Sequence, residues 1–97
     1  MAYEIVLAPQ AIEDLGRLDA HVRAEVRDAL EIHLRHEPTK VSRSRLQRLR
    51  GMTRPQYRLR VDGVRVFYDV VGAEVQVVAI VEKARAGEWL DSFGEAV

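Results

Sequence analysis

Two runs of β-forming residues joined by Asp62-Gly63 constrain the fold of this chain more than any other feature. The run from Tyr57 to Val61 alternates apolar and basic residues, and the run from Val64 to Val70 is rich in valine and aromatic residues. An Asp-Gly pair between two such runs is a strong signal for a two-residue hairpin loop. The sequence therefore predicts an antiparallel β-hairpin.

The length of the loop also predicts which side chains share a face. A two-residue loop pairs Val61 with Val64, which places Arg60 directly opposite Arg65. Like charges in this position destabilise a hairpin by up to about 1 kcal/mol. A phosphodiester would relieve the repulsion, because the guanidinium fork matches phosphate oxygens; compensation by Asp69 or screening by water is the structural alternative. Because side chains alternate across a strand, the polar face carries Arg58, Arg60, Arg65, Phe67 and Asp69.

The arginine pair lies within a wider basic band. The segment from Lys40 to Arg65 holds nine basic residues and one acidic residue, whereas the rest of the chain holds six basic and fourteen acidic residues. Such a band is expected on a protein that binds a phosphate-rich partner, although a solvated loop and strand face has the same composition. We expect Lys40 to Arg54 to steer RNA or an acidic partner in a general way.

The segments around the hairpin predict an α+β fold. Leu46 and Leu49 fit either a strand or a short helix, and Gly51 to Pro55 is predicted to be a turn. Asp19 is predicted to be the N-cap of the second helix. The remaining expected elements are a strand at Tyr3–Leu7, a helix from Pro9 to Leu18, a second helix ending before Pro38, a buried strand at Glu74–Val81 and a helix at Ala84–Phe93.

We expect two N-terminal helices and a short C-terminal helix to lie on one face of a mainly antiparallel sheet of four to five strands. Length and composition predict a single domain, residues 1–97. The chain has no cysteine, its first ten residues lack a signal-peptide pattern, and no apolar stretch approaches about 18 residues. These features predict a cytoplasmic protein with no membrane segment.

No motif predicts a metal or a small-molecule cofactor. His33 and His36 are three residues apart but lack a nearby third ligand, and the sequence has no Gly-rich phosphate loop. Trp89 fits two roles, stacking on a base or anchoring the C-terminal helix to the core. Lys83 fits a functional cation at a strand end, or the first charge after a buried strand.

Three stretches resemble the RelE/ParE toxin superfamily: Leu49-Arg50-Gly51-Met52, the hairpin from Tyr57 to Val70, and Ala79-Ile80-Val81-Glu82-Lys83. The resemblance covers about Ala2 to Phe93 and implies a RelE-like fold. It also implies a toxin of a type II toxin–antitoxin module. The implied partner is a cognate antitoxin whose disordered segment orders on binding and covers the basic face or displaces the terminal helix.

RelE-type members cleave mRNA in the ribosomal A site without a metal, by attack of the ribose 2′-OH on the adjacent phosphate. The basic hairpin positions of the family match Arg58, Arg60 and Arg65. The C-terminal arginine of the family aligns near Ala84, so Lys83 or Arg85 would substitute, and Trp89 or Leu90 stands where the family has a tyrosine. The resemblance thus implies catalytic roles for Arg60, Arg65, Lys83 and Arg85, and nucleic-acid binding by Arg48, Arg50, Arg58 and Trp89.

The interpretation as an mRNA interferase, with ribosome and mRNA as partners, has two alternatives within the superfamily. ParE-type members share the fold without the ribonuclease residues and inhibit DNA gyrase. A catalytically weak member would serve mainly as the binding partner of its antitoxin. The departures at Ala84 and Trp89, together with arginine in place of lysine on the hairpin, keep all three interpretations open.

Overall fold

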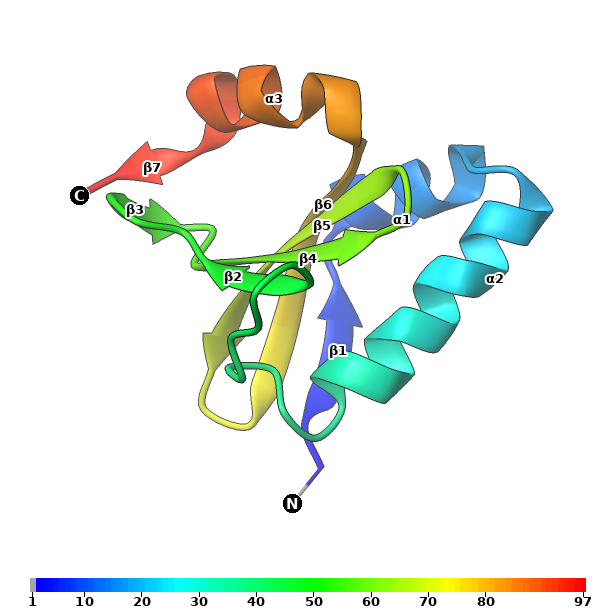
Figure 1. Cartoon of the computed structure of the whole chain (residues 1–97), viewed down its shortest axis with the longest axis horizontal. Helices are drawn as coiled ribbons and strands as arrows, with labels where there is room; N and C mark the ends of the chain where they lie inside the picture. The colour runs from blue at the N-terminus through cyan, green and yellow to red at the C-terminus, as the bar shows by residue number, and fades with distance from the viewer. Residues whose placement is uncertain (1) are drawn as a thin grey trace.

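The computed structural model describes residues 2–97 and contains a five-stranded sheet, three α-helices and a small second sheet (Figure 1). A short π-helix continues from α2, and a short 3-10 helix precedes α3. In chain order the elements are β1 (Glu4–Leu7), α1 (Pro9–Arg17), α2 (Ala20–Ala29), the π-helix η1 (Leu30–Leu34), β2 (Leu46–Arg48), β3 (Met52–Arg54), β4 (Tyr57–Val61), β5 (Val64–Val71), β6 (Glu74–Glu82), the 3-10 helix η2 (Lys83–Arg85), α3 (Ala86–Phe93) and β7 (Glu95–Ala96).

The main sheet has the strand order β1-β6-β5-β4-β2, and only the β1–β6 pair is parallel. The predicted hairpin register is confirmed, because Arg60 pairs with Arg65 and Val61 with Val64. Asp62 adopts a φ of 52° in the loop, a left-handed conformation that aspartate tolerates better than most residues. The register of the hairpin therefore fixes the positions of Arg58, Arg60 and Arg65.

The main core lies between the sheet and the α1–α2 pair. Its centre is formed by the apolar face of the hairpin, where Leu59, Val66 and Tyr68 are fully buried. The Tyr68 hydroxyl donates to the Pro38 carbonyl oxygen at 2.6 Å, which satisfies the polar end of this buried ring. Burial raises the pKa of Tyr68 far above its ordinary value, so the ring stays neutral.

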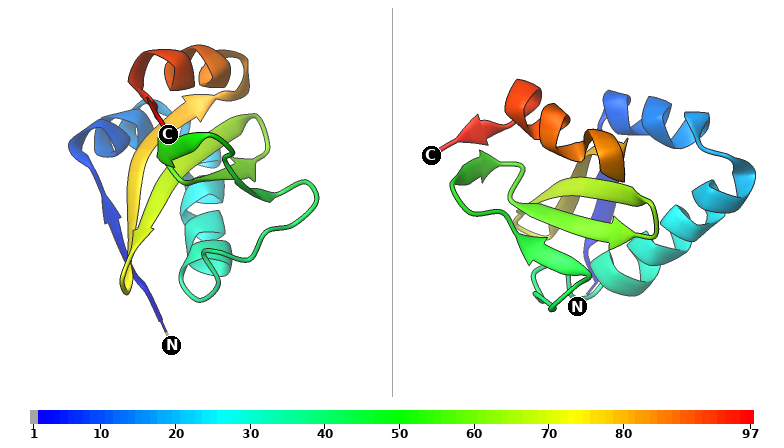
Figure 2. Two further views of the ribbon diagram at one scale, coloured as in Figure 1. Left: turned by 90° about the vertical axis from the view of Figure 1, so that its left-hand side faces the viewer. Right: turned by 45° about the horizontal axis from the view of Figure 1, so that its top comes forward.

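The expectation that all three helices share one face of the sheet is wrong. Phe67 points to the same face as the arginines and is fully buried, because Trp89 of α3 stacks on it with ring centroids 4.9 Å apart. The two views of Figure 2 show α3 and the α1–α2 pair on different sides of the sheet. The Phe67 side chain on the polar face is therefore buried by α3, which packs on that side of the sheet.

Two further expectations change in detail. The Gly51–Pro55 segment is more than a turn, because its β3 strand pairs with β7, and Figure 1 shows this small sheet beside α3. Asp19 occupies the N-cap position of α2, but its side chain makes no capping hydrogen bond. Leu46–Arg48 forms a strand against β4, which settles the open choice there. None of the helices described in residues 2–97 is long and apolar enough to cross a membrane.

Candidate nucleic-acid interface

The hairpin brings Arg58, Arg60 and Arg65 onto one face of the sheet. The register places Arg60 opposite Arg65, and Arg58 lies two residues further along β4. Within residues 2–97, none of these three guanidinium groups forms a salt bridge. The hairpin therefore holds a concentrated positive charge that the protein itself does not neutralise.

Arg65 differs from the other two because its side chain is turned back on the hairpin loop. It is only 7% exposed, and its Nη1 donates to the Asp62 carbonyl at 2.9 Å and the Val64 carbonyl at 3.1 Å. Burial lowers the pKa of Arg65, and the nearby Arg60 and Arg58 charges lower it further. The group remains a cation, and an incoming anion would relieve this electrostatic cost.

Arg58 and Arg60 are held in different ways. Arg58 is half-buried, and its Nη2 donates a short hydrogen bond to the side-chain oxygen of Gln47 on the neighbouring strand β2. Arg60 has an exposed side chain, and its backbone N–H donates to the Arg45 carbonyl at 2.7 Å. Arg58 is thus a positioned cation, whereas Arg60 is free to reach a ligand.

Asp69, which the sequence places on the same face, does not offset these arginines. Its Oδ2 lies 3.6 Å from Nε of Arg54, and its Oδ1 accepts the Gln56 backbone N–H at 2.8 Å. The carboxylate is 2% exposed, and Oδ2 has no hydrogen-bond partner within residues 2–97. Asp69 therefore compensates the edge of the basic band and leaves the hairpin cluster positive.

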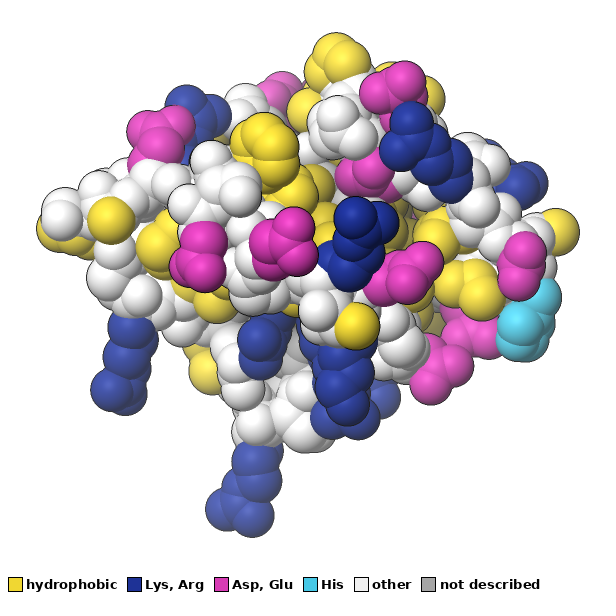
Figure 3. All heavy atoms as spheres, turned by 90° about the horizontal axis from the view of Figure 1, so that it is seen from above, with side chains coloured by type: hydrophobic (Ala, Val, Ile, Leu, Met, Phe, Trp, Pro, Cys, Tyr) yellow, Lys and Arg dark blue, Asp and Glu magenta, His cyan; other side chains and the backbone are white. Residues whose placement is uncertain are grey.

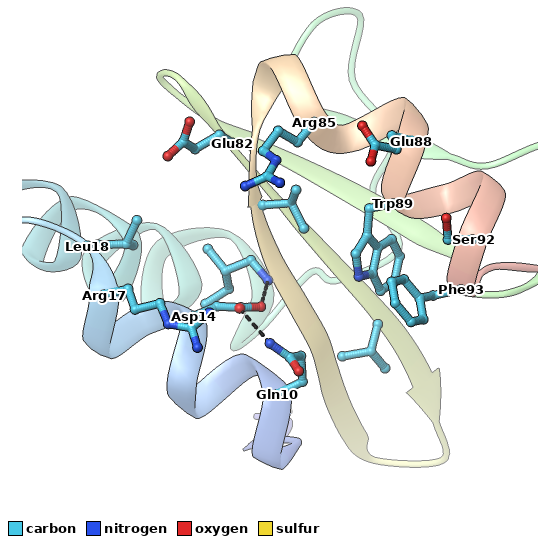
Figure 4. A pocket seen from close by; sticks show the side chains of 13 residues that line it. Gln10, Asp14, Arg17, Leu18, Glu82, Arg85, Glu88, Trp89, Ser92 and Phe93 are labelled. Atoms are coloured by element: carbon cyan, nitrogen blue, oxygen red, sulfur yellow. Dashed lines mark hydrogen bonds between the residues drawn. The ribbon is translucent and has the colours of Figure 1, made fainter.

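The two candidate cations after β6 lie next to the hairpin loop. The backbone N–H of Lys83 donates to the Gly63 carbonyl at 2.9 Å, which fixes η2 beside the loop. The side chains of Lys83 and Arg85 are exposed. Arg85 also lines a groove of about 530 Å³ between α1 and α3, where Asp14 accepts the Ile80 backbone N–H at 3.0 Å (Figure 4).

The remaining candidate residues lie at some distance from the hairpin cluster or are engaged in packing. Arg48 donates from Nη1 to the Leu49 and Gln56 carbonyls at 3.1 and 2.8 Å, and its guanidinium lies 5.4 Å from the Tyr57 ring centroid. Arg50 is exposed in the turn after β2. Trp89 packs one ring face on Phe67, so the structure places it as the anchor of α3.

Sequence reasoning missed two contacts that organise the basic band. Gln47, which positions Arg58, carried no motif, because its role depends on the pairing of β2 with β4. His33 lies 3.2 Å from Nη1 of Arg45, and burial, followed by the Arg45 charge, lowers the pKa of His33. In residues 2–97, no three His, Cys, Asp or Glu side chains are grouped so as to hold a metal ion.

Seen from above in Figure 3, acidic, basic and apolar side chains are mixed over much of the face, and several basic side chains project from its lower edge. Arginine forks on a strand face suit planar anions such as phosphate, and permanently charged guanidinium groups stabilise negative charge without exchanging protons. The arrangement is therefore suited to binding a phosphate backbone and stabilising charge that develops on it.

The fold is that of the small RelE-type toxins. The chain superposes on a free-state mutant of E. coli toxin RelE with a TM-score of 0.69 and 26% identity, covering 94% of this chain and 93% of that one. The match to the RelB–RelE antitoxin–toxin complex of Methanococcus jannaschii has a TM-score of 0.68 and 15% identity, covering 87% of this chain and 96% of that one. The match to the YoeB dimer of Staphylococcus aureus has a TM-score of 0.63 and 17% identity, covering 84% of this chain and 97% of that one.

The family follows from the sequence itself. The sequence model of the ParE toxin of the type II toxin–antitoxin system parDE matches residues 5–87. The chain belongs to this ParE toxin family, which confirms the superfamily that the hairpin motif indicated. No curated protein matches the chain significantly in sequence.

Proposed function

We propose that this toxin cleaves mRNA on the ribosome and that Arg58, Arg60 and Arg65 hold the scissile phosphate. The observation that carries the proposal is the uncompensated cluster on the hairpin, where Arg60 and Arg65 are paired across the strands. The pairing of Arg60 with Arg65 does not stabilise the hairpin itself, because like charges repel. A bound phosphodiester would offset the repulsion between the two arginines, so the pair is suited to binding one.

In the proposed reaction the ribose 2′-OH attacks the adjacent phosphorus and gives its proton to solvent water, and the bond from phosphorus to the 5′-oxygen breaks. Charge then grows on the equatorial phosphate oxygens, where fixed cations contribute most. Arg60 is exposed and reaches the phosphate first. Arg65 follows by exchanging its carbonyl partners for phosphate oxygens. Lys83, beside the loop, supplies a proton to the leaving oxygen with Arg85 assisting, and Arg48 and Arg50 contribute to binding flanking nucleotides.

The test is mRNA cleavage mapped on translating ribosomes with the parent chain and single variants. Arg60→Ala and Arg65→Ala are each expected to slow cleavage about 100-fold, the usual cost of removing one charge-stabilising group. Arg27→Ala is the matched control, because Arg27 is exposed on α2 and lies outside the basic band. Full activity of Arg65→Ala would remove Arg65 from the proposed site.

The ParE family match favours a second candidate function, inhibition of DNA gyrase. The chain also lacks the terminal tyrosine expected of a RelE-type nuclease, because Trp89 or Leu90 stands at that position, and Trp89 packs on Phe67. This candidate predicts arrest of gyrase-driven supercoiling by the purified toxin and no cleavage of mRNA on ribosomes. The two assays on the same preparation separate the candidates.

Under either activity, we propose that a cognate antitoxin neutralises this chain in the cytoplasm, where ribosomes and gyrase operate. Structures of toxin–antitoxin complexes from Methanococcus jannaschii, Mycobacterium tuberculosis and Pyrococcus horikoshii share the fold. Co-expression with the product of the open reading frame adjacent to the toxin gene is expected to abolish toxicity and yield a stable complex. Persistent toxicity in that strain would contradict the assignment of the partner.

A further inference from the structure

Asp69 is a buried carboxylate that the proposed reaction does not use. It is 2% exposed, and its Oδ1 accepts the Gln56 backbone N–H at 2.8 Å. Its Oδ2 has no hydrogen-bond partner among residues 2–97. Because removing a carboxylate oxygen from water is costly, such a group is expected to have a compensating cation. That cation is Arg54, whose Nε lies 3.6 Å from Oδ2.

The chain around Arg54 is held on two sides. The backbone of Arg54 pairs with Glu95 of β7. On the other side, Gln56 is tied to β5 twice, because its backbone N–H donates to Asp69 and its side-chain oxygen accepts the Val70 backbone N–H at 3.0 Å. These contacts fix the start of the Arg54 side chain, and the Asp69 carboxylate then fixes the position of its guanidinium group.

The guanidinium group of Arg54 is positioned but still accessible. Its side chain is 59% exposed, whereas that of Asp69 is 3% exposed. The atom that meets the carboxylate is Nε, and the two terminal nitrogen atoms form no hydrogen bond in the described part of the chain, residues 2–97. A guanidinium group held in this way presents its terminal nitrogen atoms to a ligand, and these suit the oxygen atoms of a phosphate.

Arg54 lies at the end of the arginine face that is remote from the hairpin loop. The β5 residues on this face are Arg65, Phe67 and Asp69, and Arg58 lies opposite Phe67. Side chains two residues apart on one face of a strand are about 7 Å apart, so Asp69 lies roughly 14 Å from Arg65 along β5. Arg58 is therefore intermediate between the arginine pair at the loop and Arg54.

The three arginine positions follow one line along the β4 side of the face. Trp89 of α3 stacks on Phe67 and covers the middle of β5. On the β4 side, Arg58 is held by Gln47 of β2. The step between successive positions is comparable with the distance between neighbouring phosphates in an extended single strand. A row of cations at this spacing is suited to following a single-stranded backbone.

We propose that Arg54 binds a phosphate of the RNA other than the scissile one, and that Asp69 positions Arg54 for this contact. The RNA strand then runs along β4 from the hairpin loop toward β3. The proposal rests on the proposed function for the RNA itself, and it adds the path of the strand on the toxin. Arg54 touches no reacting atom, so it is a binding residue, and Asp69 is a positioning residue.

RNA binding by the full chain tests the contact, with 2′-O-methyl oligonucleotides that cannot be cleaved. Arg54→Ala is expected to weaken binding of a hexanucleotide about fivefold and to reduce the salt dependence of log K by about 0.7, the value for one single-strand phosphate. Binding of a dinucleotide, which has one phosphate, should not change. Arg17→Ala is the control, because Arg17 is exposed on α1. Equal losses for both RNAs would overturn the proposal.

Asp69→Asn tests the positioning role through the sign of its effect. If Asp69 acted only as a negative charge near the RNA, its removal would strengthen binding. A positioning role predicts weaker binding of the hexanucleotide, and no further loss when Asp69→Asn is combined with Arg54→Ala. Tighter or unchanged binding by the folded variant would overturn this role.

Arg54→Lys provides a second test that does not alter the buried carboxylate. Lysine keeps the charge at this exposed position but has no Nε–H to meet Asp69 and no planar fork. The variant is expected to bind the hexanucleotide more weakly than the parent chain with the same salt dependence. Affinity equal to that of the parent chain would show that charge alone is sufficient and would overturn the role of Asp69.

Cleavage kinetics on translating ribosomes distinguish this proposal from the proposed function. Arg54→Ala is expected to raise KM about fivefold and to change kcat less than about twofold, because it removes binding that is equal in the ground and transition states. Cleavage that depends on Arg60 but is unchanged by Arg54→Ala would refute the additional contact and leave the proposed function intact. A parent chain that neither binds nor cleaves RNA would remove both.

Discussion

Arg58 is the hairpin arginine whose side chain is fixed by a neighbouring residue. The side-chain oxygen of Gln47 accepts a hydrogen bond from Nη2 of Arg58. The other nitrogen atoms of this guanidinium group remain available to a ligand. Within residues 2–97, Arg60 and Arg65 lack an equivalent side-chain acceptor. At the scale of single residues, Gln47 is therefore the residue that positions Arg58 in the proposed phosphate site.

Replacing Gln47 with leucine removes the acceptor and leaves Arg58 free to move. We expect Gln47→Leu to slow ribosome-dependent cleavage about 10-fold, since small displacements of a charge-stabilising group are costly, and to change the free energy of unfolding by only about 1 kcal/mol. Gln76→Leu is the control, because Gln76 donates to Glu74 instead. Equal losses in the two variants, measured by cleavage rate and urea unfolding, would argue against a positioning role.

At the scale of elements, the link between α3 and β7 depends on a glycine. A Cβ at Gly94 would lie 2.2 Å from Cε of Met52 and 2.6 Å from the Leu90 carbonyl oxygen, and the second of these atoms is backbone. A Cβ at Gly87, inside α3, would meet nothing within 4 Å. The same substitution is therefore expected to have opposite effects at the two positions.

Gly94→Ala is expected to lower the free energy of unfolding by about 1–3 kcal/mol, because overpacking against backbone forces a local shift. Gly87→Ala is expected to raise it by about 0.5–1 kcal/mol, because alanine is the better helix former. Urea unfolding of the two variants checks both signs. A destabilised Gly87→Ala protein would show that the space around α3 is smaller than the structure gives.

The sequence was informative for elements that are specified locally. The hairpin, its register and the arginine face follow from Asp62-Gly63 and strict alternation, and the structure confirms that pairing. The β3–β7 sheet was missed, because Met52–Arg54 and Glu95–Ala96 are two short strands with no periodic pattern, joined across 40 intervening residues. The side of the sheet covered by α3 depends on the Phe67–Trp89 stack, a contact that neither segment announces alone.

For the molecule as a whole, pH is expected to alter stability through His33. Its pKa in the folded state is lowered below 6.5, first by burial and then by the Arg45 charge. The unfolded chain therefore binds the proton first, so this contribution is complete above about pH 6.5 and is lost as the pH falls through the folded pKa. The free energy of unfolding should decrease between pH 7.5 and pH 5.5.

Urea unfolding at pH 7.5, 6.5 and 5.5 measures this effect in the parent chain and in His33→Asn. The asparagine variant retains a polar group near Arg45 and should lose part of the decrease. His36→Asn is the matched control, because His36 is an exposed histidine three residues further along. A pH profile of His33→Asn that coincides with that of the parent chain would exclude His33 as the titrating group.

The parallel pairing of β1 with β6 has a consequence for biosynthesis. Glu4 pairs with Glu74, so β1 lacks its partner strand until 70 further residues have been added. At typical rates of synthesis this delay lasts roughly 4–14 s. During that time the nascent chain cannot complete its sheet, so the five-stranded fold forms only after β6 has been synthesised.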